Sequence, residues 1–390
     1  MKTSSEHILT THAGSLPRPD RLTELFALRA TGVAVDEKEI ARLSAKATAD
    51  IVRQQSDAGI SVGNNGEQGR EGFFLYVQRR MSGFSGRGSR PPLQDVARYP
   101  AFQKLREQSM GARKAVSNFA PPKVTGEIRY LDAGRRELHA ELDQFDAALK
   151  SANSAFEESF VTAPSPGIIA AALPNEHYDS FDAYLSALTA ALKIEYEAII
   201  ERGHLLQIDA PDLALERHVT FADKPVGAFV EFVERIIAAI NGAIADLPAD
   251  KIRLHVCWGN YEGPHDSDVA FADIANAILA ARVGAFMLPF ANSRHAHEVD
   301  LFKGGRLRDD QVLIAGVIDT LTNFVEHPEV VAERIERAAR AVGDPTRVMA
   351  GTDCGFDTSA GMGRVAVDVV WAKLRAMRAG ADIASRRLLG

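Results

Sequence analysis

The stretch Ile252-Arg253-Leu254-His255-Val256-Cys257 is a short apolar run rich in strand-forming residues, and it decides the fold. Helical patterns flank it on both sides, at Val226–Ala245 before it and at Ala270–Ala281 after it. A strand that stands between two amphipathic helices predicts parallel strands joined by crossover helices. The stretch therefore predicts an α/β protein.

The same alternation of strand and helix extends over the rest of the chain. Candidate strands are Ile8–Gly14, Ile60–Asn64, Ser159–Thr162, Leu205–Asp209, Ile252–Val256, Ala285–Leu288, Val312–Val317 and Arg347–Ala350. Further helical patterns are Lys38–Ala58, Phe181–Arg202, Pro328–Val342 and Ala366–Arg378. Eight such units predict a (β/α)8 TIM barrel that residues 1–390 form as a single domain, and a doubly wound α/β fold is the alternative.

The segment 73–135 interrupts this alternation and predicts an insertion between the second and third strands. Its glycines and prolines include Gly83, Gly86, Gly88, Pro91, Pro92, Pro121 and Pro122. Ala115–Phe119 followed by Val124–Leu131 predicts a β-hairpin within the insertion. The arginines from Arg79 to Arg90 are interpreted as part of a solvated loop, and a phosphate-binding patch is the alternative.

The composition is that of a globular protein, with 46% hydrophobic and 25% charged residues. A net charge of −7 gives no support for binding to nucleic acid or to an anionic membrane. The first residues, Met1–His7, contain no apolar run of the kind found in secretory signals, and no stretch has the roughly 20 apolar residues of a membrane span. We therefore expect a cytoplasmic protein with reduced cysteines.

The two cysteines each follow a predicted strand. His255 and Cys257 are two residues apart, so in an extended strand both side chains point to the same face. Cys354 follows the last predicted strand. One imidazole and two thiolates form a soft ligand set suited to zinc, with a fourth position left open. The alternative is a pair of unrelated buried thiols, because free cysteine packs as a small hydrophobic side chain.

Other polar side chains also follow predicted strands, where the active groups of a TIM barrel gather. They are His12, Ser15, Glu67, Asp209 and Asp212. Any one of them could be a turn residue. Counted with His255 and the two cysteines there are eight such positions, which predicts that these side chains gather at one rim of the barrel.

Motifs spread over nearly the whole chain carry a family resemblance. They are Thr10–Arg18 (TTHAGSLPR), Asn65–Gly69 (NGEQG), Gln207–Leu213 (QIDAPDL), His255–His265 (HVCWGNYEGPH), Ser293–Glu298 (SRHAHE), Val325–Pro328 (VEHP) and Thr352–Gly355 (TDCG). With these motifs the chain resembles the cobalamin-independent methionine synthase family, specifically the C-terminal catalytic barrel. Within that superfamily it is similar to the epoxyalkane:coenzyme M transferase branch.

The resemblance implies one zinc ion held by His255, Cys257 and Cys354, where an acceptor thiol is alkylated. It also implies that Ser15, Glu67 and Asp209 hold the acceptor, an amino-acid thiol such as homocysteine. Two carboxylates suit an ammonium group, because charge-assisted hydrogen bonds are stronger than neutral ones. The implied enzyme is a zinc-dependent S-methyltransferase, like the 5-methyltetrahydropteroyltriglutamate–homocysteine methyltransferases.

The sequence departs from the family at two positions. Pro289 stands where members carry a glutamate zinc ligand, which leaves water, substrate, or a side chain among Asp353, His295, His297 and Glu298 to complete the site. Leu321 stands where methionine synthases carry a histidine, so proton delivery to a folate leaving group is in question. The N-terminal barrel of complete methionine synthases has no counterpart in these residues. We therefore expect a donor other than methyltetrahydrofolate polyglutamate, for example a methyl-corrinoid protein or a small methylated compound. A methylfolate is the other candidate donor.

An epoxide as the alkyl donor is the main alternative. A thiolate would then open the ring, and the alkoxide would need a proton donor, for which His265, His295 and His12 are candidates. A zinc hydrolase and a non-catalytic ligand-binding barrel are further alternatives. The sequence leaves open the acceptor, the donor and any assembly into a homo-oligomer.

Overall fold

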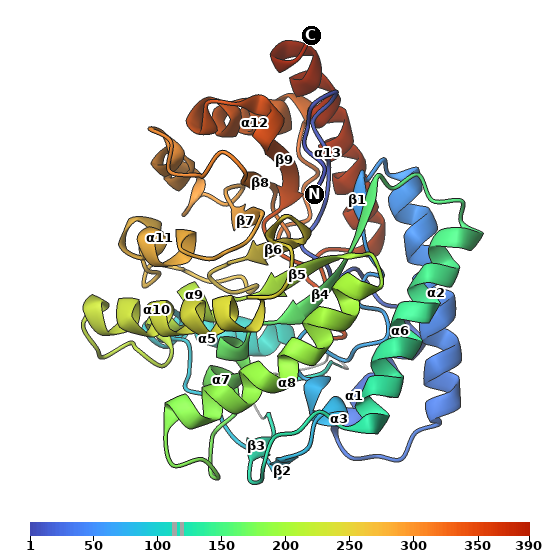
Figure 1. The fold of residues 1–390 in the computed structure, drawn as a ribbon, viewed down its shortest axis with the longest axis vertical. Helices are drawn as coiled ribbons and strands as arrows, with labels where there is room; N and C mark the ends of the chain where they lie inside the picture. The colour runs from blue at the N-terminus through green and yellow to red at the C-terminus, as the bar shows by residue number, and fades with distance from the viewer. Residues whose placement is uncertain (111–114, 118–120) are drawn as a thin grey trace.

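A computed structural model describes residues 1–110, 115–117 and 121–390. A curled sheet of seven parallel strands lies at the centre of the molecule, in the order β1-β4-β5-β6-β7-β8-β9 (Figure 1). The strands are β1 (Val62–Gly63), β4 (Glu158–Pro164), β5 (Leu205–Asp209), β6 (Ile252–His255), β7 (Ala285–Pro289), β8 (Val312–Ile318) and β9 (Val348–Thr352). The sheet forms a half-barrel, which confirms the predicted α/β class with parallel strands.

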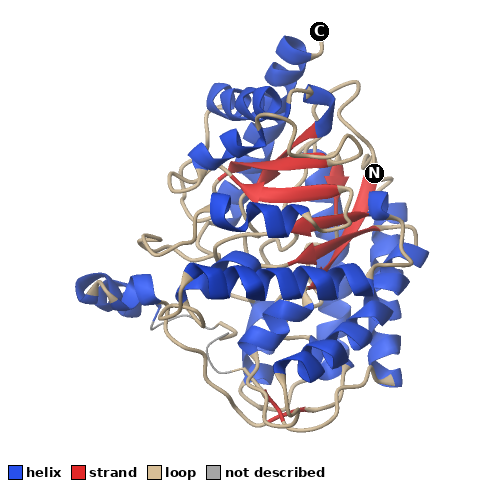
Figure 2. Cartoon of the chain, turned by 60° about the vertical axis from the view of Figure 1, so that its left-hand side comes forward, coloured by secondary structure: helices blue, strands red, loops and turns tan. Residues whose placement is uncertain are grey.

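Helices connect the strands and cover the outside of the sheet (Figure 2). The longer ones are α1 (Asp20–Ala30), α2 (Glu37–Asp57), α6 (Asp132–Ser151), α8 (Phe181–Glu201), α10 (Val226–Ala243), α12 (Pro328–Val342) and α13 (Val367–Leu388). The shorter ones are α7 (Pro166–Ala172), α9 (Asp212–Leu215) and α11 (Phe271–Leu279), and the 3-10 helices are η1 (Glu216–His218), η2 (Ala249–Lys251), η3 (Ala296–Phe302) and η4 (Pro345–Arg347). Apolar side chains between sheet and helices form the main core.

Helix α12 has the predicted bounds, because its ends are specified locally. Pro328 occupies the first turn, where its missing N–H is not needed, and Gly343 ends the helix with a φ of 85°. Helix α13 runs ten residues beyond its predicted end at Arg378. A Cβ added at Gly380 would lie 2.5 Å from the Cβ of Val331, so this glycine allows α13 to pack closely on α12.

The predicted first strand, Ile8–Gly14, makes only single parallel bridges. Thr10 bridges Ala350 of β9, and Thr11 bridges Val62 of β1, so the segment lies between the two edge strands of the sheet. The hydroxyls of the two threonines donate to the carbonyl oxygens of Gly59 and Val62 at 2.9 and 2.8 Å. Side-chain hydrogen bonds thus occupy groups that a regular ladder would use.

The insertion between β1 and β4 contains α3 (Val77–Arg80), α4 (Gln94–Ala97), α5 (Pro100–Met110) and one antiparallel pair, β2 (Phe84–Ser85) with β3 (Lys123–Val124). The predicted hairpin of Ala115–Phe119 with Val124–Leu131 includes residues 118–120, which lie outside the described residues. Within the described part, Val124 pairs with Phe84 instead. The turn residues marked an irregular segment correctly, but they could not specify which distant partner would pair with Val124.

The first two arginines of the predicted solvated loop form ion pairs, whereas Arg87 further along is exposed. Arg80 is buried and forms ion pairs with Glu141 and with Glu195, the latter at 2.8 Å. Arg79 pairs with Glu137 at 2.8 Å. Acidic partners therefore already occupy these two guanidinium groups, which is the arrangement of an internal ion-pair network and not of a phosphate site.

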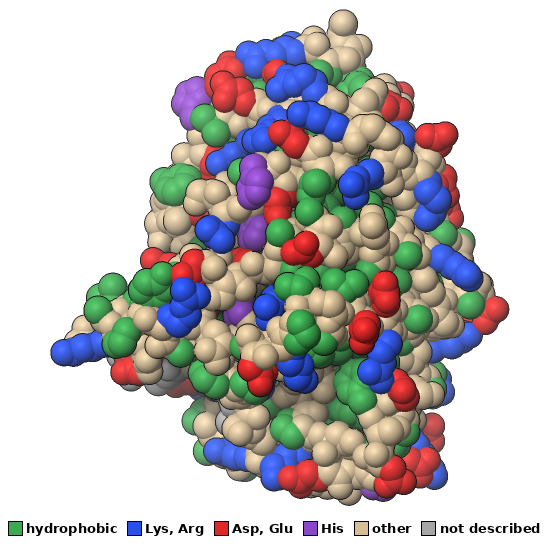
Figure 3. Space-filling view, turned by 90° about the vertical axis from the view of Figure 1, so that its left-hand side faces the viewer, with side chains coloured by type: hydrophobic (Ala, Val, Ile, Leu, Met, Phe, Trp, Pro, Cys, Tyr) green, Lys and Arg blue, Asp and Glu red, His purple; other side chains and the backbone are tan. Residues whose placement is uncertain are grey.

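The surface shows mixed charge on the face seen in Figure 3, where acidic and basic side chains are interspersed with apolar ones. In the described part of the chain, none of the helices combines the length and the hydropathy that crossing a bilayer requires.

Candidate metal and substrate site

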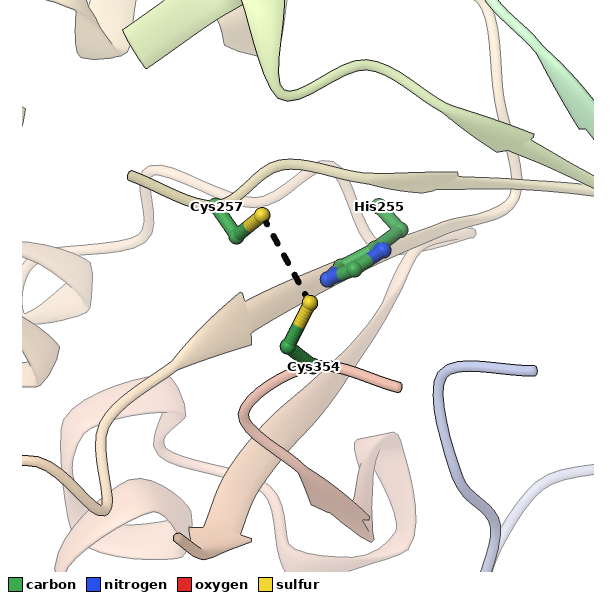
Figure 4. Close-up of side chains that lie close together, drawn as sticks. All are labelled: His255, Cys257 and Cys354. Carbon is green, nitrogen blue, oxygen red and sulfur yellow. Dashed lines mark hydrogen bonds between the residues drawn. The ribbon is translucent and has the colours of Figure 1, made fainter. Parts of the chain in front are cut away.

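Three candidate ligands meet at the carboxyl ends of two strands. His255 is the last residue of β6, Cys257 follows two residues later, and Cys354 lies two residues beyond the end of β9. Strands β7 and β8 separate β6 from β9, so the curl of the sheet is what brings Cys354 to the other two. In Figure 4 the two sulfur atoms face each other and the imidazole of His255 lies beside them.

The geometry of the three side chains fits a metal ion. One ligand atom from each lies within 4.8 Å of the others, all three residues are buried, and the two Sγ atoms are 3.9 Å apart. Tetrahedral zinc with Zn–S bonds of about 2.3 Å separates two sulfurs by about 3.8 Å. A disulfide needs about 2.05 Å, and both cysteines are free. The donor set and its spacing therefore suit zinc.

The surroundings of His255 direct one ring nitrogen at the cysteines. Its Nδ1 lies 3.0 Å from Oδ1 of Asp209, which leaves Nε2 for the ligand position. Burial lowers the pKa of His255, but hydrogen bonds with Asp209 and Cys257 outweigh burial and raise the pKa to about 10. A hydrogen bond from Cys354 lowers the pKa of the Cys257 thiol well below its ordinary value. The site thus favours an anionic sulfur.

The three predicted acceptor-binding residues line a cavity of about 150 Å³ beside this cluster. Ser15, Glu67 and Asp209 share that cavity with His255 and both cysteines. Ser15 Oγ and Glu67 Oε2 are buried and have no hydrogen-bond partner in the described residues. Buried polar atoms are normally paired, so these two atoms indicate a missing polar ligand.

Burial and the nearby Asp209 carboxylate raise the pKa of Glu67 to about 7. Its other oxygen, Oε1, accepts a hydrogen bond from Thr162 Oγ1 at 3.0 Å. Two buried carboxylates in one small cavity favour a cationic group between them, because the cation would offset their mutual repulsion.

The candidate proton donors, His265 and His295, lie in a different cavity. That cavity has a volume of about 720 Å³, and Cys257 and Cys354 also line it. The ring nitrogens of His295 contact Asp268 at 2.9 Å and Glu298 at 2.7 Å, and those of His265 contact Asp268 and the Tyr261 carbonyl at 3.0 Å.

These contacts hinder His265 and His295 from donating a proton to a substrate. Burial lowers the pKa of His295, but the carboxylates of Asp268 and Glu298 outweigh burial and raise the pKa to about 9. His12 is also engaged, since Nε2 contacts Gln55 at 2.8 Å and Nδ1 accepts from Gly14, and burial lowers its pKa to about 4. Delivering a proton from any of the three would break existing hydrogen bonds.

The side chains near Pro289 do not join the cluster among the described residues. Asp353 accepts hydrogen bonds from the backbone N–H groups of Ala291 and Asn292 at 2.8 and 2.9 Å. Glu298 accepts from Phe271 N and contacts His295, and His297 is exposed. Each of the suggested substitutes for the family's glutamate therefore contacts other groups or is exposed, and none is placed as a metal ligand. Among the described residues the cluster offers three protein ligands.

Asp268, which none of the sequence motifs marked, joins three histidines. It contacts His265 and His295 as described, and its Oδ1 lies 3.2 Å from Nδ1 of His218. Tyr261 lies 3.2 Å from the other ring nitrogen of His218 and donates to Asp95 of the insertion at 2.6 Å. Asp268 lies in a loop with no periodic pattern, so only its nearness in sequence to His265 could have indicated it.

Comparisons with known proteins agree with the fold and the motifs. No protein-family model matches the chain. It is 26% identical to the methionine synthase of Thermococcus kodakarensis over 348 residues, which cover 89% of this chain and 86% of that protein. The methionine synthase of Sulfolobus acidocaldarius is 26% identical over 350 residues, covering 89% and 85%.

A solved structure shows the same fold. The B12-independent methionine synthase from Shewanella sp. W3-18-1, in complex with selenomethionine, aligns with a TM-score of 0.72 and 20% identity over 98% of this chain and 99% of that one. The class is thus that of parallel α/β proteins with the methionine synthase fold. Sequence and fold together confirm the resemblance to the cobalamin-independent methionine synthase family that the motifs carry.

Proposed function

We propose that the protein is a zinc-dependent alkyltransferase that transfers a methyl group to a thiol such as homocysteine. The observation that carries this proposal is the buried cluster of His255, Cys257 and Cys354 beside a small cavity that contains unpaired polar atoms. The names of the relatives support the same reaction. Zinc, when bound, would deprotonate the acceptor thiol and so generate the nucleophile at neutral pH.

The residues of the small cavity would bind and orient the acceptor. Glu67 and Asp209 would hold an ammonium group, and Ser15 would hydrogen-bond the polar end of the molecule. An apolar cavity of about 150 Å³ accommodates a ligand the size of benzene, so this cavity suits a small amino-acid thiol. Fixing the acceptor at both ends aligns its sulfur for in-line attack on a methyl carbon.

The larger cavity would admit the alkyl donor, because Cys257 and Cys354 also line it. Methyl transfer needs no proton donor for an alkoxide, whereas epoxide opening does. Because His12, His265 and His295 are all engaged by protein partners, the surroundings favour methyl transfer over the epoxide reaction.

The proposal includes a closed barrel. The segment Ile8–Gly14 would serve as the eighth strand, since its bridges lie between β1 and β9. Residues 1–390 would then form one (β/α)8 domain with the insertion covering the mouth, where Arg90 and Leu93 line the small cavity.

Metal analysis combined with spectroscopy tests the function. We expect about one zinc per chain in the purified, reduced protein. We also expect homocysteine to change the visible spectrum of the cobalt-substituted protein, because a new sulfur ligand alters the ligand field. A metal-free protein, or a cobalt spectrum that no thiol perturbs, would contradict the proposal.

Acceptor binding should depend on pH through Glu67. Its pKa is raised to about 7, so the carboxylate that would pair with an ammonium exists mainly above pH 7 and is lost as the pH falls. The apparent Kd for homocysteine should therefore rise as the pH drops from 8 to 6, measured on the cobalt-substituted protein. 3-Mercaptopropionate, which has no ammonium, is the control and should show the smaller pH dependence. Equal dependence for both thiols would exclude Glu67 as the ammonium partner.

A further inference from the structure

The inner face of β5 and β6 carries a buried row of polar side chains behind the candidate metal site. Arg253, His255 and Cys257 follow at every second position and so face the same way. On the neighbouring strand, Gln207 pairs in register with Arg253, and Asp209 pairs with His255. The sheet register therefore places the Gln207–Arg253 pair next to the Asp209–His255 pair. The Asp209–His255 pair lies nearer the carboxyl ends of the strands.

Hydrogen bonds connect the four side chains into a continuous chain. Arg253 Nε donates to Gln207 Oε1 at 2.7 Å, and Gln207 Nε2 donates to Asp209 Oδ1 at 2.7 Å. The same Oδ1 lies 3.0 Å from His255 Nδ1. All four residues are buried, with exposed fractions of 0% for Arg253 and Gln207 and 5% or less for the other two.

The direction of this chain is fixed because a guanidinium can only donate. Arg253 must face the oxygen of the Gln207 amide, so the amide NH2 must point to Asp209 and to the Ala13 carbonyl, which lies 2.6 Å away. Asp209 Oδ1 then accepts from both Gln207 and His255 Nδ1–H. A proton held on Nδ1 directs Nε2 at the two cysteines, where a bound metal would take the place of the Nε2 proton.

Arg253 is also an unusual buried charge. Its other contacts are Thr11 Oγ1 at 3.0 Å, the His12 carbonyl at 2.7 Å, the Met287 sulfur at 3.7 Å and the face of the Phe160 ring at 3.8 Å. In the described part of the chain no carboxylate lies within 4.0 Å of its guanidinium. A buried cation without an ion pair is costly unless a negative charge nearby offsets it. The carboxylate of Asp209 is the negative group toward which the hydrogen-bonded chain leads.

We propose that Arg253 and Gln207 are positioning residues for the metal site. They hold Asp209, and through it they fix the tautomer and the orientation of His255 as a ligand. This inference rests on the proposed metal site at His255, Cys257 and Cys354. Asp209 then has two roles, with Oδ1 committed to the histidine and Oδ2 left to face the acceptor cavity.

Zinc affinity tests this proposal without any assay of activity. Partners that orient a metal-binding histidine typically contribute about 10–100-fold to metal affinity. We expect Gln207→Leu to bind one zinc per chain with an affinity lower by about this factor, measured by competition with a chromophoric chelator. Gln207→Glu should weaken zinc binding too, since an ionised glutamate accepts from Arg253 but cannot donate to Asp209.

Gln311→Leu is the matched control. Gln311 is also buried, but it precedes β8 at the amino end of the barrel, where its side chain donates to Val283 O. Wild-type zinc affinity in Gln311→Leu, beside weaker binding in both Gln207 variants at comparable thermal stability of the zinc-free proteins, would support the proposal. Unchanged affinity in the Gln207 variants, or an equal loss in Gln311→Leu, would overturn it. A wild-type protein without zinc would instead contradict the proposed function and this inference with it.

Discussion

Replacing Cys257 or Cys354 by serine is expected to abolish stoichiometric zinc binding and, with it, thiol alkylation. A serine hydroxyl stays protonated at neutral pH, so each variant keeps only one thiolate and the imidazole of His255. The loss should exceed the roughly 10–100-fold that removal of an outer hydrogen-bond partner causes, because a metal ligand itself is removed. Metal analysis of the purified variants after dialysis against a weak chelator measures the effect.

Val256→Thr provides the control for these variants. Val256 lies next to Cys257 and is fully buried, but it faces the opposite side of the strand. The change places a hydroxyl in a buried position at the same rim without removing a ligand atom. Zinc retained in Val256→Thr and lost in both serine variants would assign the ligands, whereas one zinc per chain in both serine variants would exclude them.

The parallel strands and their helices could be predicted because their signals are local. Leu205–Asp209 and Pro328–Val342 are observed with the predicted bounds, and the other buried strands differ by one or two residues at most ends. The segment Ile8–Gly14 was harder to assign, since the hydroxyls of Thr10 and Thr11 bond to carbonyl oxygens beside a regular ladder. Pairing of β2 with β3 depends on contacts across almost forty residues, which no local pattern specifies.

In the candidate site, too, features set by neighbouring residues could be predicted, whereas contacts between distant segments could not. The spacing of His255 and Cys257 placed both on one face of a strand, and the barrel hypothesis placed Cys354 near them. No local pattern could show that Asp209 uses one oxygen for His255, because that contact depends on the register between β5 and β6. Likewise, His265 and His295 resembled free acids until the structure placed Asp268 between them.

The second large effect concerns selection of the acceptor. Glu67→Gln removes a negative charge from the small cavity while it keeps the size of the side chain. A hydrogen bond to a charged group contributes about 1.5–3 kcal/mol, so homocysteine should bind about 10–150-fold more weakly to the variant. Thiols without an ammonium, such as 2-mercaptoethanesulfonate, should change little.

Asp209→Ala should behave differently from Glu67→Gln. Because Asp209 also contacts His255 Nδ1, its loss should weaken the metal site and thus the binding of every thiol, with a further loss for homocysteine. Titrating each thiol into the cobalt-substituted proteins separates the two effects, since metal content is measured in the same samples. Glu195→Gln is the matched control, because Glu195 is fully buried but bonds to Tyr76 and Arg80 away from the cavity. Equal weakening of both thiols in Glu67→Gln would show that the cavity does not recognise an ammonium, and the acceptor would then be a thiol of another class.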